Sequence, residues 1–154
     1  MHTVYSKISK YATIVSRQYY QLILIVGRDA QINTQLLQIF ASIYQTTSIN
    51  FTIEYAKKVN TSDCSINDVM AEIATTQINT PLLFDAIDVL FDKQVNNTND
   101  PYILLRSFSR HRIVISTWLG QYENQSITYA IPGHSEYYVY NDVDSIVIDA
   151  NELI

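Results

Sequence analysis

The residues best placed to do chemistry lie in the segment LILIVGRDAQINT, between Leu22 and Thr34. A run of aliphatic residues ends at Gly27, a polar stretch follows, and Thr34 opens a segment in which apolar residues recur at helical spacing. A buried strand, a turn and a helix in this order are typical of a phosphate-binding loop, because the backbone N–H groups at the start of a helix attract anions. The candidate cofactor-binding residues are therefore Gly27, Arg28, Asp29, Ala30, Gln31, Ile32, Asn33 and Thr34.

This candidate loop is incomplete when it is compared with the P-loop pattern G-x-x-x-x-G-K-[ST]. Gly27 and Thr34 fill the first and last positions, but Ile32 and Asn33 stand where the second glycine and the lysine belong. A branched isoleucine resists positive φ and crowds an anion, and asparagine offers only neutral hydrogen bonds in place of the lysine charge. We therefore expect ATP with Mg²⁺ to bind weakly or not at all. Taken alone, the segment fits an ordinary strand-to-helix turn of an α/β domain better.

A second candidate group is the acid at the end of the apolar run in PLLFDAID. In P-loop proteins an aspartate at the carboxyl end of a buried strand helps to hold the magnesium ion beside the phosphate loop. Thr34 and Asp85 are thus the candidate metal ligands, and Asp85 and Asp88 are the candidate catalytic residues. Ala86 follows Asp85 where an ATPase commonly has a second acid, so Asp88 would have to reach the site from about one helical turn on. The alternative for Asp85 is a helix N-cap at a strand end.

Composition narrows the class of protein. A chain of 154 residues with 47% hydrophobic residues is long enough for one domain, residues 1–154, with a real core. No apolar run approaches the roughly 18 residues needed to cross a membrane, and the first residues lack a secretory signal. The single cysteine, Cys64, excludes an internal disulfide framework and fits a cytoplasmic location. A net charge of −5 argues against strong direct nucleic-acid binding, which depends on neutralising phosphates.

The pattern of apolar residues predicts strands that alternate with helices. This order favours an α/β fold, a P-loop NTPase-like three-layer arrangement with a mostly parallel central sheet and a short strand-rich C-terminal segment. We expect Leu22–Val26 to lie beside Leu82–Phe84 in that sheet. The predicted strands are Leu22–Val26, Asn50–Tyr55, Leu82–Phe84, Ile113–Trp118, Ser126–Ala130, Glu136–Tyr140 and Ser145–Ile148, with a turn at Pro132-Gly133. The predicted helices are Tyr5–Tyr20, Thr34–Tyr44, one capped by Ser65 or Asn67 that ends near Thr76, Ile87–Phe91 and Tyr102–Arg110.

Three segments carry a resemblance to a known family: PLLFDAIDVLFD, DPYILLRSFSRHRIVISTWLGQY and SITYAIPGHSEYYVY. They resemble the BrxF family, small P-loop-containing proteins of the type III BREX phage-defence system. The resemblance covers roughly Leu22–Tyr140, and Thr128–Tyr140 is its most specific part. The chain departs from the family in the phosphate loop, at Ile32 and Asn33. The resemblance implies a P-loop fold, a place in phage defence, and other BREX proteins as partners.

The remaining polar candidates favour protein contacts. The dense basic cluster consists of Arg106, Arg110, His111 and Arg112. These cations lie near the end of a predicted helix, where they would interact favourably with its dipole. The alternative is that an arginine of the cluster contacts the nucleotide of a neighbouring subunit or an acidic partner. Thr117 is either a polar sensor near the site or an ordinary strand residue. His134 and Glu136 do not make a zinc site, which needs four ligands. Because tyrosine and arginine are favoured in interfaces, we expect Thr128–Tyr140 and the cluster to make contacts.

Three functions remain open. The favoured one is an accessory, non-hydrolysing P-loop-like subunit of a BREX-type phage-defence system with a role in complex assembly, alone or as a homo-oligomer. The second is a weak nucleotide-binding ATPase of the same system, in which Arg28 or an arginine from another chain replaces the missing lysine. The third is a DNA-binding module that uses the cluster Arg106–Arg112, which the acidic balance of the chain disfavours.

Overall fold

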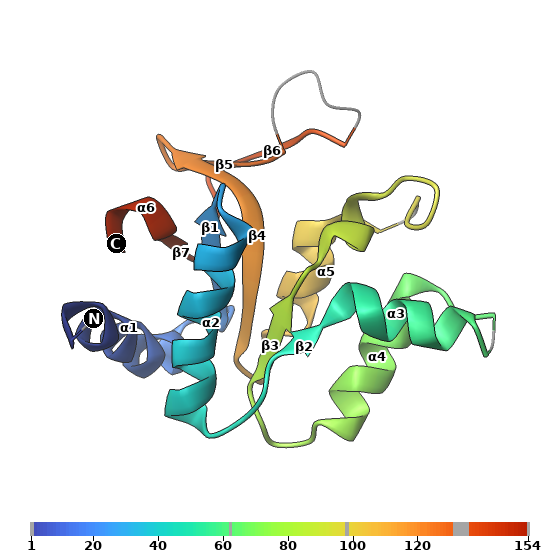
Figure 1. Cartoon of the computed structure of the whole chain (residues 1–154), viewed down its shortest axis with the longest axis horizontal. Coiled ribbons are helices and arrows are strands. Elements are labelled where there is room, and N and C mark those ends of the chain that lie inside the picture. The colour runs from blue at the N-terminus through green and yellow to red at the C-terminus, as the bar shows by residue number, and fades with distance from the viewer. Residues whose placement is uncertain (1, 62, 98, 131–135, 154) are drawn as a thin grey trace.

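The computed structural model describes residues 2–61, 63–97, 99–130 and 136–153. The α-helices are α1 (His2–Ile14), α2 (Ala30–Tyr44), α3 (Phe51–Val59), α4 (Ile66–Thr76), α5 (Pro101–Ser107) and α6 (Ala150–Leu153), and the 3₁₀ helices are η1 (Val15–Arg17) and η2 (Asp88–Phe91). The strands are β1 (Leu22–Gly27), β2 (Ile49–Asn50), β3 (Leu82–Asp85), β4 (Val114–Glu123), β5 (Ser126–Tyr129), β6 (Tyr138–Asn141) and β7 (Ile146–Asp149). Figure 1 shows α1, α2 and α6 on one side of the sheet and α3, α4 and α5 on the other. The predicted α/β class with a mostly parallel central sheet and helices on both sides is confirmed.

The sheet has the strand order β2-β3-β4-β1-β7, and every pairing along this path is parallel. The expectation that Leu22–Val26 lies beside Leu82–Phe84 is wrong, because β4 runs between these two strands. Val114 of β4 is in register with Leu22 on one side and with Leu82 on the other. Buried side chains on both faces of β4 suit it to this central place.

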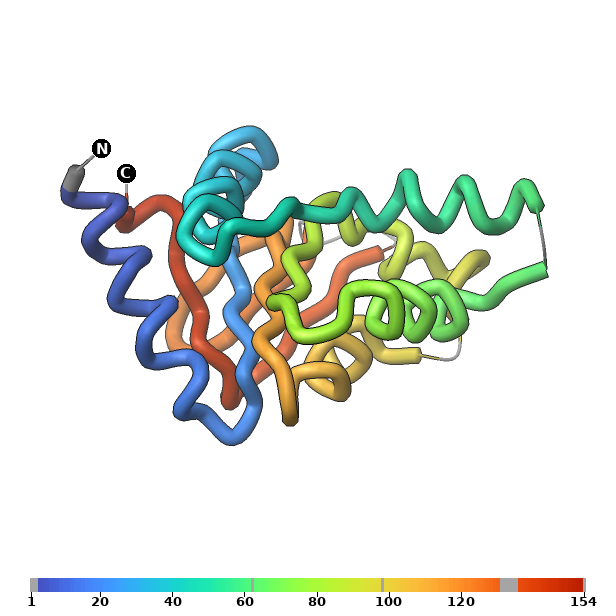
Figure 2. The backbone as a smooth tube through the Cα atoms, turned by 90° about the horizontal axis from the view of Figure 1, so that it is seen from below, coloured from blue at the N-terminus to red at the C-terminus, as the bar shows by residue number. Residues whose placement is uncertain are grey.

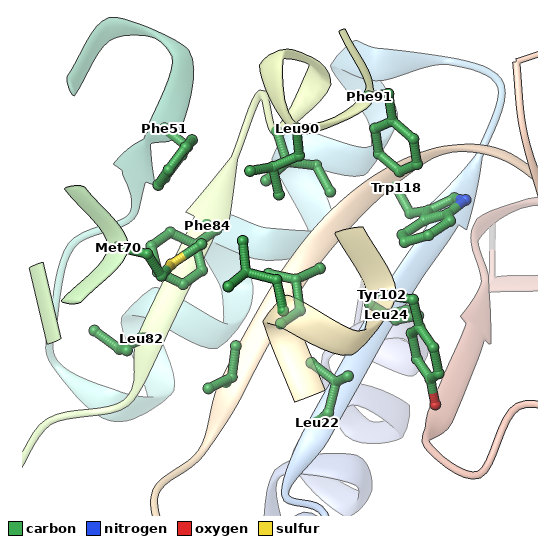
Figure 3. Packing of buried hydrophobic residues seen from close by; sticks show 14 of the residues in the cluster. Leu22, Leu24, Phe51, Met70, Leu82, Phe84, Leu90, Phe91, Tyr102 and Trp118 are labelled. Carbon is green, nitrogen blue, oxygen red and sulfur yellow. The ribbon is translucent and has the colours of Figure 1, made fainter. Parts of the chain in front are cut away.

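Strand β1 separates two hydrophobic cores, which explains its unbroken apolar run. Leu22, Leu24 and Val26 face the core formed with α4, α5 and η2, and part of this packing is shown in Figure 3. Ile23 and Ile25 face the opposite core, formed with α1 and α2. Because successive side chains of a strand point to opposite faces, a strand covered by helices on both sides must be apolar at every position.

The segment after α2 differs from the prediction. A strand over Asn50–Tyr55 was expected, but β2 ends at Asn50 and helix α3 begins at Phe51. The side chain of Asn50 accepts a hydrogen bond from the backbone N–H of Ile53, so a helix cap overrides the β-branched content of this segment. The cap predicted at Ser65 is confirmed, and with Asp68 it forms a capping box at the start of α4. Helix α6 was not predicted.

The chain beyond the parallel sheet forms an antiparallel extension. Strand β4 continues to Glu123 and pairs with β5, which pairs in turn with β6 (Figure 1). Gly120 is required here, because a Cβ at this position would lie 1.7 Å from the carbonyl oxygen of Thr128. The turn predicted at Pro132-Gly133 lies outside the described residues.

Helices α3 and α4 run alongside each other and reach away from the rest of the chain (Figure 2). Helix α3 begins at the carboxyl end of β2, whereas α4 ends shortly before the amino end of β3. Among the described residues, no helix is both long enough and apolar enough to cross a membrane.

Candidate functional site

The turn between β1 and α2 is closed by its own side chains. Only Arg28 and Asp29 separate the strand from the helix, so Gln31, Ile32 and Asn33 belong to the first turn of α2. The carboxylate oxygen Oδ1 of Asp29 accepts hydrogen bonds from the backbone N–H groups of Gln31 at 3.0 Å and Ile32 at 3.2 Å. These are the donors that a bound anion would use. A carboxylate of the chain itself therefore occupies the start of α2.

Asn33 fastens the same turn from inside. Its side chain is only 1% exposed, and Nδ2 donates to the carbonyl oxygens of Gly27 at 3.0 Å and Trp118 at 3.4 Å. Its Oδ1 atom is buried without a hydrogen-bond partner. A Cβ on Gly27 would lie 2.5 Å from that oxygen, so the glycine makes room for the asparagine. At the position of the P-loop lysine, the side chain thus points back into the protein.

Asp85 is held by hydroxyl groups from two neighbouring elements. Thr34 of α2 donates its Oγ1 hydrogen to Oδ2 of Asp85 at 2.8 Å, and Thr117 of β4 donates to Oδ1 at 2.8 Å. The backbone N–H of Ala86 also donates to Oδ1, at 3.0 Å. The structure therefore brings together two candidate residues, Thr34 and Asp85, that lie 51 positions apart in the chain, and it adds Thr117.

These groups line a hollow of about 220 Å³ at the carboxyl ends of β3 and β4. The lining residues are Ala30, Asn33, Thr34, Asn50, Asp85, Ala86, Ile87, Asp88, Thr117 and Leu119. Two of them are acids, and none of these described lining residues is a lysine or an arginine. Arg28, proposed above as a substitute for the missing lysine, does not line the hollow and instead donates to Oε1 of Gln121 at 2.6 Å.

Asp88 lies at the same hollow and is tied to the antiparallel extension. The hydroxyl of Tyr129 donates to Oδ1 of Asp88 at 2.7 Å. Burial, and then the hydrogen bond to this carboxylate, raise the pKa of Tyr129 well above its usual range. The tyrosine therefore stays protonated, and Asp88 has a fixed donor from β5.

The segment between Asp85 and Asp88 is joined to α3. Ala86 has a left-handed backbone, with φ of 52°, and its carbonyl oxygen accepts hydrogen bonds from the hydroxyl and the backbone N–H of Thr52. Asn50 also lines the hollow. Asn50 and Thr52 were not predicted as site residues, because Asn50–Tyr55 was expected to be a strand. The signal that could have found them is an asparagine placed to cap a helix.

The donor set limits what the site can hold. Thr34 and Asp85 could ligate a magnesium ion through hydroxyl and carboxylate oxygens, with Asp88 at the same hollow. Across the described residues, no cluster of three or more histidine, cysteine, aspartate or glutamate side chains is arranged to hold a metal ion. The first N–H groups of α2 already bond to Asp29, and two of the lining residues of the hollow are acids. The roles predicted for Gly27–Thr34 and for the acids stay predictions.

The basic cluster is engaged within the chain. Arg106 pairs with Asp144 at 3.2 Å, and Arg110 donates to the carbonyl oxygen of Tyr19 at 2.8 Å while stacking on its ring. Arg112 donates to the carbonyl oxygens of Ala74 and Gln77 at the end of α4. These contacts join α5 and the loop that follows it to neighbouring elements, and Arg112 is the one of the three that bonds carbonyl groups at a helix end.

The tyrosines of the predicted contact segment also pack internally. Tyr129 is buried and stacks on Phe91 with 3.5 Å between ring centroids, and Trp118 meets Phe91 edge-on, as Figure 3 shows. Tyr138 and Tyr140 are half-buried against the same group. The expectation that Thr128–Tyr140 offers its tyrosines to partners is therefore wrong for Tyr129, and His134 lies outside the described residues.

No known protein family, curated protein or solved structure matches this chain.

Proposed function

We propose that this chain is an accessory, non-hydrolysing P-loop-like subunit of a BREX-type phage-defence system, which works through protein contacts. The observation that carries the loss of nucleotide binding is the hydrogen bonding at the start of α2. Asp29 takes the N–H groups of Gln31 and Ile32, and Asn33 is turned inward. The link to phage defence is supported by the resemblance of the segments between Leu22 and Tyr140 to the BrxF family.

Charge supports the same proposal. A nucleotide triphosphate brings several negative charges, and the hollow beside α2 presents Asp85 and Asp88 without a lining lysine or arginine among its described residues. Without a counter-charge, these carboxylates oppose phosphate binding. The domain then keeps the shape of a nucleotide site but serves as a scaffold.

A weak ATPase is the second candidate, and one observation favours it. Oγ1 of Thr34 lies 2.8 Å from Oδ2 of Asp85, and such proximity is expected of two residues that share a magnesium ion. In that case Arg28 would have to leave Gln121 and turn toward the phosphates.

Isothermal titration of ATP and of ADP with Mg²⁺, alongside light scattering, separates the two candidates. The proposal predicts no measurable heat of binding and no ATP-dependent change in oligomeric state. Arg28→Ala should leave co-purification with other BREX components and phage protection intact. Micromolar ATP affinity that Arg28→Ala or Asp85→Ala abolishes would establish the ATPase instead.

A further inference from the structure

The hollow at Asp85 continues around Asp88 into a second, larger one. This second hollow measures about 430 Å³ and shares Asn50, Ala86 and Asp88 with the first. Its lining residues are Asn50, Thr52, Ile53, Ala86, Asp88, Val89, Asp92 and Glu136. Because the two hollows share a wall, they form one concave surface between α3, η2 and the end of β3, which we call the strand-end groove.

The charges of the strand-end groove have one sign. Its ionisable lining residues are Asp85, Asp88, Asp92 and Glu136, and the described residues that line it include no lysine or arginine. Lys93 lines an adjoining hollow that shares Asp92 and Glu136 with the groove, and its ammonium lies over the ring of Tyr138, so the end of the groove at Asp85 and Asp88 is the end without a lysine beside it among the described residues. A concave surface lined by one sign of charge focuses the electric field and attracts groups of the opposite sign.

Two apolar side chains, Ile53 and Val89, also line the groove. Ile53 is 51% exposed on α3, and Val89 of η2 is half-buried beside it. An isoleucine left this exposed beside a hollow offers apolar area that a partner can cover. The groove therefore combines a smaller hollow lined by Asp85 and Asp88 with a larger one lined by Ile53, Val89 and further acids.

We infer that the strand-end groove is a docking site for a partner protein's segment that carries an arginine or lysine next to an apolar residue. The cationic group enters the hollow at Asp85 and Asp88, and the apolar side chain covers Ile53 and Val89. The occupant is chosen by charge complementarity, because the described lining residues of the groove include four acids and no lysine or arginine. This inference rests on the proposed function, since a nucleotide in the hollow would compete with the segment.

The test uses the full chain, labelled with ¹⁵N, and the peptide acetyl-Ala-Leu-Ala-Arg-Ala-Leu-amide as probe. Titration should shift the amide resonances of Ala86, Asp88 and Val89 saturably. Replacing the peptide arginine with neutral citrulline should weaken binding about tenfold, the usual effect of losing a charged hydrogen bond. Raising the salt concentration should weaken binding of the arginine peptide more than that of the citrulline peptide.

Matched variants locate the site. Asp88→Asn keeps an acceptor for Tyr129 and should weaken binding about fivefold, as should Ile53→Ser. Asp142→Asn and Ile103→Ser are the controls, because Asp142 is an exposed acid and Ile103 is 53% exposed, and neither lines the groove. Both controls should bind the peptide like the unmodified chain.

Three results would overturn the inference. They are equal affinity for the arginine and citrulline peptides, shifts confined to other surfaces, and a dimer in light scattering that Asp88→Asn dissolves, which would make a second copy the occupant. An ATP titration of the same sample separates this failure from that of the proposed function. Absence of both peptide and ATP binding removes only the groove inference, while micromolar ATP binding removes the proposed function.

Discussion

Two loops at the same edge of the sheet have opposite characters. In the loop after β1, polar side chains form hydrogen bonds within the protein. Asp29 caps α2, and Asn33 donates to the carbonyl groups of Gly27 and Trp118. The loop after β3 leaves Asp85 at a hollow, with hydroxyl groups as partners. Both follow buried apolar strands at the carboxyl edge, where ligands bind in open α/β sheets. Both loops thus lie at the edge where ligands bind in such sheets, and the two acids that line the hollow, Asp85 and Asp88, come from the β3 side.

The difference lies in how each turn satisfies its backbone groups. A turn from a buried strand into a helix leaves buried carbonyl groups and helix-start N–H groups that need partners. Here the asparagine amide satisfies the carbonyl groups and the aspartate satisfies the helix start. These two side chains therefore stabilise the closed turn, and four predictions test this contrast.

The largest effect is expected from Asn33→Asp. The new carboxylate oxygen would face the carbonyl oxygens of Gly27 and Trp118 in a buried site, which should cost about 3 kcal/mol of unfolding free energy in urea denaturation. Asn50→Asp, at the end of β2 and the start of α3, is the matched control for an exposed asparagine. The side chain of Asn50 accepts from the N–H of Ile53, and aspartate caps equally well, so the change should stay within about 0.5 kcal/mol. Equal losses at the two positions would show that the buried carbonyl contacts of Asn33 are not the cause of its loss.

Gly27→Ala should come next. Its Cβ would lie 2.5 Å from Oδ1 of Asn33 and 2.9 Å from Cβ of Ala150, an overpacking that costs about 1–3 kcal/mol. Thermal and urea unfolding measure the loss. The double variant Gly27→Ala with Asn33→Ala should lose less than the sum of its two single variants, since the clash disappears with the asparagine. Strictly additive losses of unfolding free energy would show that Gly27 is not needed to make room for Asn33.

Thr117→Val should have a smaller effect. The change removes one hydrogen bond to Asp85 at nearly constant volume, and water in the adjoining hollow can take over the bond, so about 1 kcal/mol is expected. The unfolding free energy from urea titration provides the measurement. A loss as large as that of Asn33→Asp would mean that Asp85 is sealed from solvent and that the β3 loop is closed as well.

Ala86→Gly should have the smallest effect and the opposite sign. The left-handed φ of 52° penalises alanine, and glycine relieves this at some entropic cost, for a net gain of about 0.5 kcal/mol. Glycine–alanine exchange thus destabilises one loop and stabilises the other. Differential scanning calorimetry resolves the rise in Tm, and a fall in Tm would show that the methyl group of Ala86 contributes packing that outweighs its strain.

Much of the frame could be predicted from local patterns. The unbroken apolar runs of β1 and β3 follow from burial on both faces of the sheet. Ser65, one of the two residues predicted to cap α4, is its N-cap and forms a capping box with Asp68. Strand order could not be predicted in the same way. The position of β4 between β1 and β3 depends on tertiary packing between segments far apart in the chain.

The site shows the same limit at the level of side chains. That Asp85 ends a strand is visible in the sequence, but its bonds to Thr34 and Thr117 need three elements to meet. Asp29 was predicted as part of a binding loop, although an aspartate before a helical run is also a common N-cap. Asn33 looked like a weak substitute for lysine. Its inward role depends on the carbonyl group of Trp118, which lies 85 residues away and left no local signal.

The most direct test of the closed loop follows the two amides that Asp29 caps. In ¹⁵N-labelled protein, ATP with Mg²⁺ is titrated while the resonances of Gln31 and Ile32 are recorded, with Asp29→Ser as the comparison. The account predicts that neither resonance moves up to millimolar ATP in the unmodified chain, because the carboxylate already holds both N–H groups. Saturable shifts of both resonances at micromolar ATP, without any change at Asp29, would contradict it.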